Sequence, residues 1–159
     1  VALPVMLRIW KTERIAEIAQ RAMREIRGRK ELIEPYASLI TFLAYSGNTE
    51  KMMGMLPEFA AWTETSTTPF EHFHGLLAMI LAMRSLQMDQ QNEIKLQLPK
   101  FHPLFKESGE YSTEALLQDY ISRAQQIAAQ FDQRNGNYWF AERLKEASED
   151  LSGFIPFPL

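Results

Sequence analysis

Residues 39–56 read LITFLAYSGNTEKMMGML, in which two apolar runs lie on either side of a Gly-Asn pair. Glycine tolerates the positive φ with which many helices end, and asparagine and threonine favour the position at which the next helix begins. The stretch therefore predicts one helix that ends at Gly47 and a second that is capped by Asn48 or Thr49. We expect helical hairpins of this kind to be the units of the fold.

The composition of the whole chain agrees with a helical fold. Its 159 residues include only seven glycines and eight prolines, and residues that lose little rotamer freedom in a helix predominate. This length suffices to bury one substantial core, so we expect a single all-α domain over residues 1–159. Because the first residue is Val1, we expect this domain to be a fragment of a larger protein.

The absence of cysteine limits the chemistry that the chain can perform and bears on the cellular compartment in which we expect it. It excludes thiol catalysis, thiolate metal sites and a disulfide scaffold, and it agrees best with a reducing, cytoplasmic location. The longest apolar run, GLLAMILAM at residues 75–83, ends at Arg84 and is much shorter than the roughly 20 residues needed to cross a bilayer. The first ten residues lack the pattern of a signal peptide, so we expect no membrane contact.

Apolar spacing and helix-capping residues predict where the helices begin and end. A helix that starts at Pro69 is apolar on nearly all sides, which indicates burial between its neighbours. Pro57 is expected to kink or break the helix that contains it, and the proline-broken tail, residues 153–159, either packs back on the domain or binds elsewhere. The predicted helices cover residues 4–10, 12–27, 32–46, 48–62, 69 onward, 89–98, 112–131 and 137–151.

A second Gly-Asn pair, at residues 136–137, repeats the opening pattern, because SGNTEKMMGML aligns with NGNYWFAERLK. Here the chain resembles a tetratricopeptide-type helical repeat. Ile40, Met52 and Asp132 depart from that family's pattern, and the two glycines are 89 residues apart, which is not a multiple of its period of about 34 residues. The residues that carry the resemblance are Tyr36, Leu39, Leu43, Gly47, Asn48 and Met52 and, more weakly, Ala128, Ala129, Gly136, Asn137, Tyr138 and Ala141.

Two architectures stay open: antiparallel helical hairpins stacked as a tetratricopeptide-like (TPR-like) right-handed superhelix, or a compact bundle of about seven helices. The resemblance implies a scaffold whose concave face binds a peptide, a protein or a small regulatory ligand. Our first hypothesis is a non-enzymatic protein–protein interaction domain, a sensor or adaptor module of a larger regulatory protein. The residues expected to line its partner-binding groove are Tyr36, Met53, Trp62, Tyr138, Trp139 and Phe140.

An interior pocket for a small ligand is the second hypothesis. His74 and Arg84 are polar residues on an otherwise apolar helix, and we expect both to bind the ligand. An unpaired buried Arg84 would cost several kcal/mol, so its guanidinium must reach water or an anion. His72 and His74 point about 200° apart on a helix and cannot share one ion, so we expect no metal site.

Motifs for catalysis are missing from the sequence. It contains no glycine-rich phosphate loop, no nucleophile elbow and no His-Glu-x-x-His. We therefore expect no enzymatic activity and no cofactor.

Basic side chains are concentrated near the start of the chain. Residues 8–30 hold eight of the seventeen basic side chains and three of the twenty acidic ones. Nucleic-acid contact through the basic helix 12–30 is therefore a third hypothesis. It is the least favoured one, because no aromatic residues interleave with the arginines and the net charge is −3. The expected basic patch consists of Arg14, Arg21, Arg24, Arg29 and Lys30.

Overall fold

The hairpin predicted around Gly47 is present in the computed structural model, which describes residues 13–159. Helix α3 (Ile33–Ser46) ends at Gly47, whose φ of 73° is the left-handed conformation that glycine tolerates. Gly136 has a φ of 67° and ends α7 (Thr113–Asn135) in the same way before α8 (Trp139–Glu149) begins. The helix predicted over residues 4–10 lies outside the described residues.

Residues 13–159 form seven α-helices, one short 3-10 helix and one two-stranded hairpin, so the domain is mostly helical rather than all-α. The remaining elements, in chain order, are α2 (Glu13–Ile26), η1 (Lys30–Leu32), α4 (Thr49–Met53), α5 (Leu56–Glu64), α6 (Pro69–Met88), β1 (Glu93–Lys95) and β2 (Glu110–Ser112).

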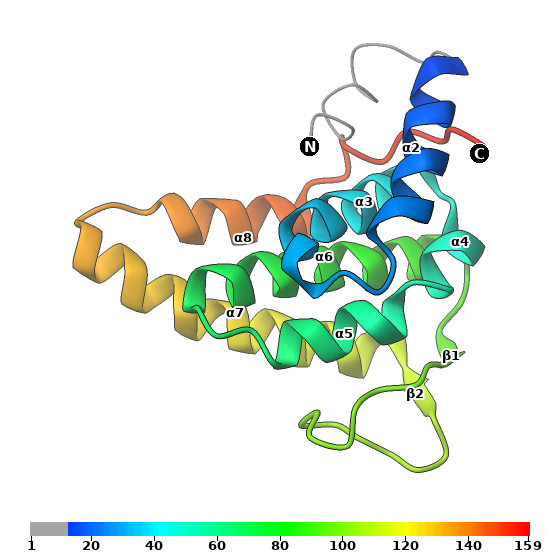
Figure 1. Ribbon diagram of the computed structural model, residues 1–159. Coiled ribbons are helices and arrows are strands. Elements are labelled where there is room, and N and C mark those ends of the chain that lie inside the picture. Colours follow the sequence, from blue (N-terminus) through cyan, green and yellow to red (C-terminus); the bar gives the residue numbers. More distant parts are fainter. Residues whose placement is uncertain (1–12) are drawn as a thin grey trace.

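Helices α3, α6 and α8 run parallel to one another. The Ser85 hydroxyl donates to the Ala44 carbonyl at 3.0 Å near the ends of α6 and α3, while Glu34 acts electrostatically on His74 near their beginnings. Likewise, Phe73 contacts Phe140 at the start of α8, with ring centroids 5.1 Å apart. Helices α5 and α7 return in the opposite direction (Figure 1).

Helix α6 is the centre of the core, as its apolar sequence predicted. Twelve of its twenty residues are buried, and α3, α5, α7 and α8 all pack against it. Burial of most of its surface requires this composition, because the buried faces meet other apolar surfaces rather than water, while Phe70, His74 and Leu77 keep some exposed surface. None of the helices in the described part of the chain combines the length and apolar character needed to cross a membrane.

The helix predicted over residues 89–98 is wrong. The chain there leaves α6 through Gln90, which has a positive φ of 61°, and continues as β1, which pairs antiparallel with β2. Ile94, Leu96 and Leu98 are buried and alternate with more exposed residues, and this period of two is that of a strand with one buried face.

The single helix predicted over residues 48–62 is divided in two, and the break is not at Pro57. Helix α4 ends at Met53, the chain turns at Gly54 and Met55, and α5 begins at Leu56. Pro57 lies in the first turn of α5, where its missing N–H would have no intrahelical acceptor. Of the two predicted fates of the tail, the structure has the first, because the tail packs back along the end of α3.

Candidate functional site

A groove with a volume of about 590 Å³ lies between α3 and α8, and α6 forms its floor. We call it the α3–α6–α8 groove. Helix α3 contributes Ser38 and Thr41, α6 contributes Leu77 and Leu81, and α8 contributes Trp139. The side chains at the centre of the groove are mainly apolar, so it offers an apolar surface that these three helices leave unfilled.

The groove extends over about three helical turns. Its lining residues run from position 34 to 45 on α3 and from 70 to 81 on α6, and each span is about 17 Å long at a rise of 1.5 Å per residue. Because α3 and α6 are parallel, their lining residues follow the groove in the same direction along this length. The shape is that of a trough for an elongated group.

Aromatic side chains form one end of the groove. Phe70 and Trp139 both line it and are both 41% exposed. Phe140 lies behind them, 6% exposed and stacked on Phe131 with ring centroids 4.4 Å apart, which fixes the start of α8. Exposed aromatic rings that are held rigidly by packed neighbours are typical anchor points for a partner.

His74 is a polar side chain among these apolar lining residues. Its ring lies 4.3 Å from that of Phe70, and its Nε2 is buried without a hydrogen-bond partner among the described residues. Burial lowers the pKa of His74, nearby Glu34 opposes this shift, and Arg143 adds to it. The imidazole is therefore neutral at pH 7, with one donor and one acceptor. Because Nε2 has no exposed surface, a ligand atom could pair with it only after the ring turns toward the groove, and this pairing would remove an unsatisfied polar group costing about 1–3 kcal/mol.

Charged residues border the groove on both sides. Glu34 lies in the first turn of α3, and on α8 the Arg143 guanidinium pairs with Glu146 at 3.0 Å and lies 5.3 Å from the centre of the Trp139 ring. All three charged side chains are exposed, so the pair contributes little stability by itself. They surround the apolar centre with charges of both signs.

Arg84, which we predicted to bind a ligand together with His74, caps α8 instead. Its Nη1 donates to the carbonyl oxygens of Ala147 at 2.5 Å and Asp150 at 3.0 Å, and its guanidinium lies 5.2 Å from the centre of the Phe154 ring. These carbonyls at the end of α8 have no intrahelical donor, so a buried cation satisfies them. Burial lowers the pKa of Arg84, and Tyr45 and acidic residues near the end of α8 oppose this shift.

The six predicted partner-binding residues do not come together in one groove. Tyr36 is 1% exposed, stacks on Phe59 with centroids 5.5 Å apart and meets the edge of Trp62 at 5.3 Å. Tyr138 is 77% exposed at the turn between α7 and α8. The remaining positions divide in the same way: Met53 and Trp62 are partly buried against the core, Phe140 is buried, and of the six only Trp139 lines the α3–α6–α8 groove.

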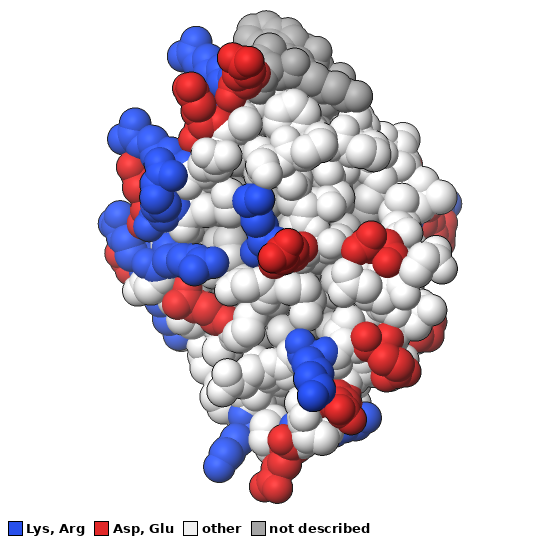
Figure 2. Space-filling model, turned by 90° about the vertical axis from the view of Figure 1, so that its right-hand side faces the viewer, with Lys and Arg blue, Asp and Glu red and all other residues white. Residues whose placement is uncertain are grey.

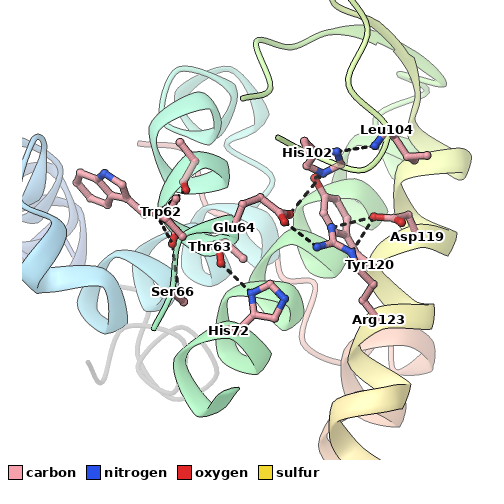
Figure 3. Close-up of polar contacts among 12 residues, drawn as sticks. Trp62, Thr63, Glu64, Ser66, His72, His102, Leu104, Asp119, Tyr120 and Arg123 are labelled. Carbon is pink, nitrogen blue, oxygen red and sulfur yellow. Dashed lines mark hydrogen bonds and ion pairs between the residues drawn. The ribbon is translucent and has the colours of Figure 1, made fainter. Parts of the chain in front are cut away.

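A buried polar network that the sequence did not reveal joins α5, α7 and the connection between the two strands (Figure 3). The Glu64 carboxylate pairs with Nη1 of Arg123 at 2.8 Å, and Arg123 also pairs with Asp119 at 2.8 Å. Nε2 of His102 lies 3.2 Å from the Tyr120 hydroxyl and 3.6 Å from Glu64. The spacing of Asp119 and Arg123, four residues apart on a helix, was the one available signal.

The geometry around His102 fixes its tautomer. The backbone N–H of Leu104 donates to Nδ1 at 3.0 Å, so Nδ1 carries no proton and the neutral ring is protonated on Nε2. Burial lowers the pKa of His102, with opposing effects from Glu64 and Asp119 and a further lowering from Arg123. The charged and polar groups of this network pair with one another. In this geometry they hold the connection between the strands against α5 and α7.

The predicted basic patch is partly neutralised by its own neighbours. Arg21 pairs with Glu25 at 2.7 Å, and Arg29 pairs with Glu31 at 3.0 Å. Figure 2 shows one face of the molecule, on which Lys and Arg side chains along the left side of the view have Asp and Glu side chains among them. A mixed surface of this kind does not present the continuous positive potential that a phosphate backbone requires.

No three His, Asp or Glu side chains within residues 13–159 gather in an arrangement that could hold a metal ion. No protein-family model, curated protein sequence or solved structure matches the chain at a significant level.

Proposed function

We propose that this chain is a non-enzymatic interaction domain and that the α3–α6–α8 groove binds an amphipathic helix of a partner protein. The observation that carries the proposal is the trough between two parallel helices, three turns long and mainly apolar at its centre. A helix buried in such a trough presents apolar residues at i, i+3 or i+4, and i+7, which is the spacing of three successive anchors along about 10–17 Å.

The tetratricopeptide resemblance supports the same assignment. In stacked helical hairpins the first helix of each hairpin forms the inner, binding face and the second helix forms the outer face. Helices α3, α6 and α8 are parallel and α5 and α7 return behind them, which is the order of helices that such a stack requires. We propose that the three parallel helices are the inner face of a short right-handed stack.

The groove also specifies features of the partner helix. Leu77 and Leu81 on the floor favour aliphatic or aromatic anchors, and Phe70 and Trp139 favour a large apolar residue at one end. A turn of the His74 ring that exposes its unpaired Nε2 would favour one hydroxyl or amide among these apolar residues. The partner helix is therefore apolar on one face, with a single polar group at its centre.

A matched pair of variants tests the proposal. Trp139 lines the groove, whereas its neighbour Tyr138 does not and is more exposed. Helical peptides selected from a displayed random library against the wild-type chain should carry the i, i+3 or i+4, i+7 apolar pattern. Trp139→Ala should weaken their binding about tenfold or more in isothermal titration calorimetry, and Tyr138→Ala should change it less than about twofold. Equal effects of the two changes, or selection of no helical peptide, would overturn the proposal.

A small ligand in the same groove is the second candidate, and the unpaired Nε2 of His74 is the observation in its favour. Arg84 does not line this groove, and its Nη1 donates to the end of α8. A thermal-shift screen of small molecules bearing a hydroxyl or carboxylate separates the candidates. Stabilisation that is lost in His74→Phe, together with no binding of helical peptides, would favour the small ligand.

A further inference from the structure

The tail forms a short extended segment that is hydrogen-bonded along one side to residues 45–51, which comprise the end of α3, the turn and the start of α4 and which we call the α3–α4 turn. The N–H groups of alternate residues donate to this turn: that of Ile155 to the Tyr45 carbonyl at 2.7 Å and that of Phe157 to the Ser46 carbonyl at 3.0 Å. Both acceptors lie in the last turn of α3, where carbonyls have no intrahelical donor. The end of α3 thus accepts hydrogen bonds from one side of the extended tail.

Two side chains of the turn complete the contact. The Asn48 amide is used twice, because its Nδ2 donates to the Phe157 carbonyl at 2.8 Å and its Oδ1 accepts from the Leu159 N–H at 3.0 Å. The Lys51 ammonium donates to the Leu159 carbonyl at 2.9 Å. These contacts are made to backbone atoms of the extended tail and do not depend on its side chains.

The sequence of the tail matches this one-sided pattern. Pro156 and Pro158 occupy the alternate positions, where an N–H would point away from the turn, and both are exposed. The apolar residues before, between and after the two prolines pack against the core: Phe154, Ile155, Phe157 and Leu159. Phe154 meets the edge of the Tyr45 ring with centroids 5.1 Å apart.

We propose that the α3–α4 turn is a recognition site for extended peptides in which proline alternates with large apolar residues, and that residues 154–159 are a ligand bound to it in cis. The turn supplies backbone acceptors, a bidentate amide and an ammonium, and the core supplies an apolar surface for alternate side chains. This site adjoins the α3–α6–α8 groove at Tyr45 but does not depend on the function proposed for the groove. A linked segment competes at an effective concentration in the millimolar range, so a free peptide binds well only when the tail is loosened.

Gly153 offers a way to loosen the tail without touching the ligand sequence. A Cβ at this position would lie 2.6 Å from Cε1 of Tyr45, so a larger residue displaces the start of the tail. The probe is the labelled, amidated peptide FIPFPL, which contains no equivalent of residue 153. In fluorescence anisotropy, the full chain with Gly153→Val should bind this peptide at least tenfold more tightly than the wild-type chain does.

Controls on both partners make the result specific. Asn48→Ala added to Gly153→Val should weaken peptide binding about tenfold or more, while Glu50→Ala, an exposed change in the same turn, should leave it within twofold. A peptide N-methylated at the residue equivalent to Phe157 should bind as poorly as a scrambled one. Circular dichroism must show that every variant is folded.

Three results would overturn the proposal. The first is failure of the folded Gly153→Val chain to bind FIPFPL more tightly than the wild-type chain does. The second is binding that is indifferent to Asn48→Ala. Concentration-dependent dimers of Gly153→Val that do not bind free peptide would also overturn it, because they would show that the turn accepts only the linked tail of a second copy.

Discussion

Asp132 shows at the scale of one residue why the chain departs from the tetratricopeptide pattern. Its carboxylate is 7% exposed and accepts from the backbone N–H groups of Phe140 at 3.0 Å and Ala141 at 2.9 Å. These N–H groups belong to the first turn of α8, where no intrahelical acceptor exists and negative charge is favoured. Asp132 lies on α7 and caps the start of α8. An aromatic residue at position 132 would remove this cap.

Asp132→Ala should therefore destabilise the domain by about 1–3 kcal/mol, because one buried and one part-buried N–H group lose their acceptor. Urea unfolding followed by circular dichroism measures the change. Gln133→Ala, an exposed substitution one residue later, is the control and should fall within about 0.5 kcal/mol of the wild type. Equal stability of the Asp132→Ala and Gln133→Ala chains would contradict the assigned cap.

His102 makes the stability depend on pH. Its folded-state pKa lies below the value of 6.5 for an exposed histidine, chiefly because the ring is buried, so the unfolded chain binds the proton more readily. The stabilisation is complete above about pH 6.5 and is lost as the pH falls toward the folded-state pKa. The free energy of unfolding should thus decrease between pH 7.5 and pH 5.

The slope of this decrease is the quantity to compare, because His102→Gln also changes the absolute stability. Urea unfolding at several pH values should give a shallower pH dependence for His102→Gln than for the wild-type chain. His74, whose pKa is also lowered by burial, accounts for a remaining part of the slope. An unchanged slope in His102→Gln would show that His102 is not titrated on unfolding in this range.

At the scale of the elements, the close packing of α5 against α6 depends on Gly75. A Cβ on Gly75 would lie 2.6 Å from Oγ1 and 2.7 Å from Cγ2 of Thr63, which is itself 1% exposed and unable to move aside freely. Gly75→Ala should destabilise the domain by about 1–3 kcal/mol through overpacking, although alanine is the better helix former.

Gly54 provides the matched control for this prediction. Its backbone is helical, with φ at −66°, and the nearest atom to an added Cβ is 3.5 Å away, so Gly54→Ala should be neutral or stabilising by up to about 1 kcal/mol. Thr63→Ala should also recover part of the stability lost in Gly75→Ala. A Gly75→Ala chain as stable as the wild type would contradict the close approach.

The elements also show which information the sequence contains locally. Helices α2, α3, α6 and α7 were predictable because their periodicity and caps lie within one segment. The alternation of Ile94, Leu96 and Leu98 predicts a strand by the same reasoning, but proline and glycine after it obscured the period. The contact between Glu64 and Arg123 joins residues 59 apart in the chain, and no local pattern indicates it.

The candidate site, too, depends on contacts between distant residues that no local pattern indicates. Trp139 and His74 could be selected from the sequence as an aromatic and a polar residue at unusual positions, and both line the groove. Arg84 was selected by the same reasoning, yet it caps α8 through carbonyls more than sixty residues away. The groove itself arises from the spacing between α3 and α8, which depends on how both helices pack on α6.

At the scale of the whole molecule, one layer of parallel helices presents both proposed sites. The α3–α6–α8 groove lies along this layer, and the α3–α4 turn that holds the tail lies at its end. Tyr45 belongs to both, since it lines the groove and contacts Phe154 of the tail. The second layer, α5 and α7, provides the support that holds the parallel helices in place (Figure 1).

The central claim is that the α3–α6–α8 groove receives a partner helix, and an NMR titration of the labelled chain with a selected helical peptide tests it most directly. We predict that the largest amide chemical-shift changes occur at Thr41, Leu77 and Arg143, one on each helix of the groove, and that they disappear in Trp139→Ala. Changes concentrated on α2 or on the connection between β1 and β2, with α3, α6 and α8 unaffected, would contradict the account.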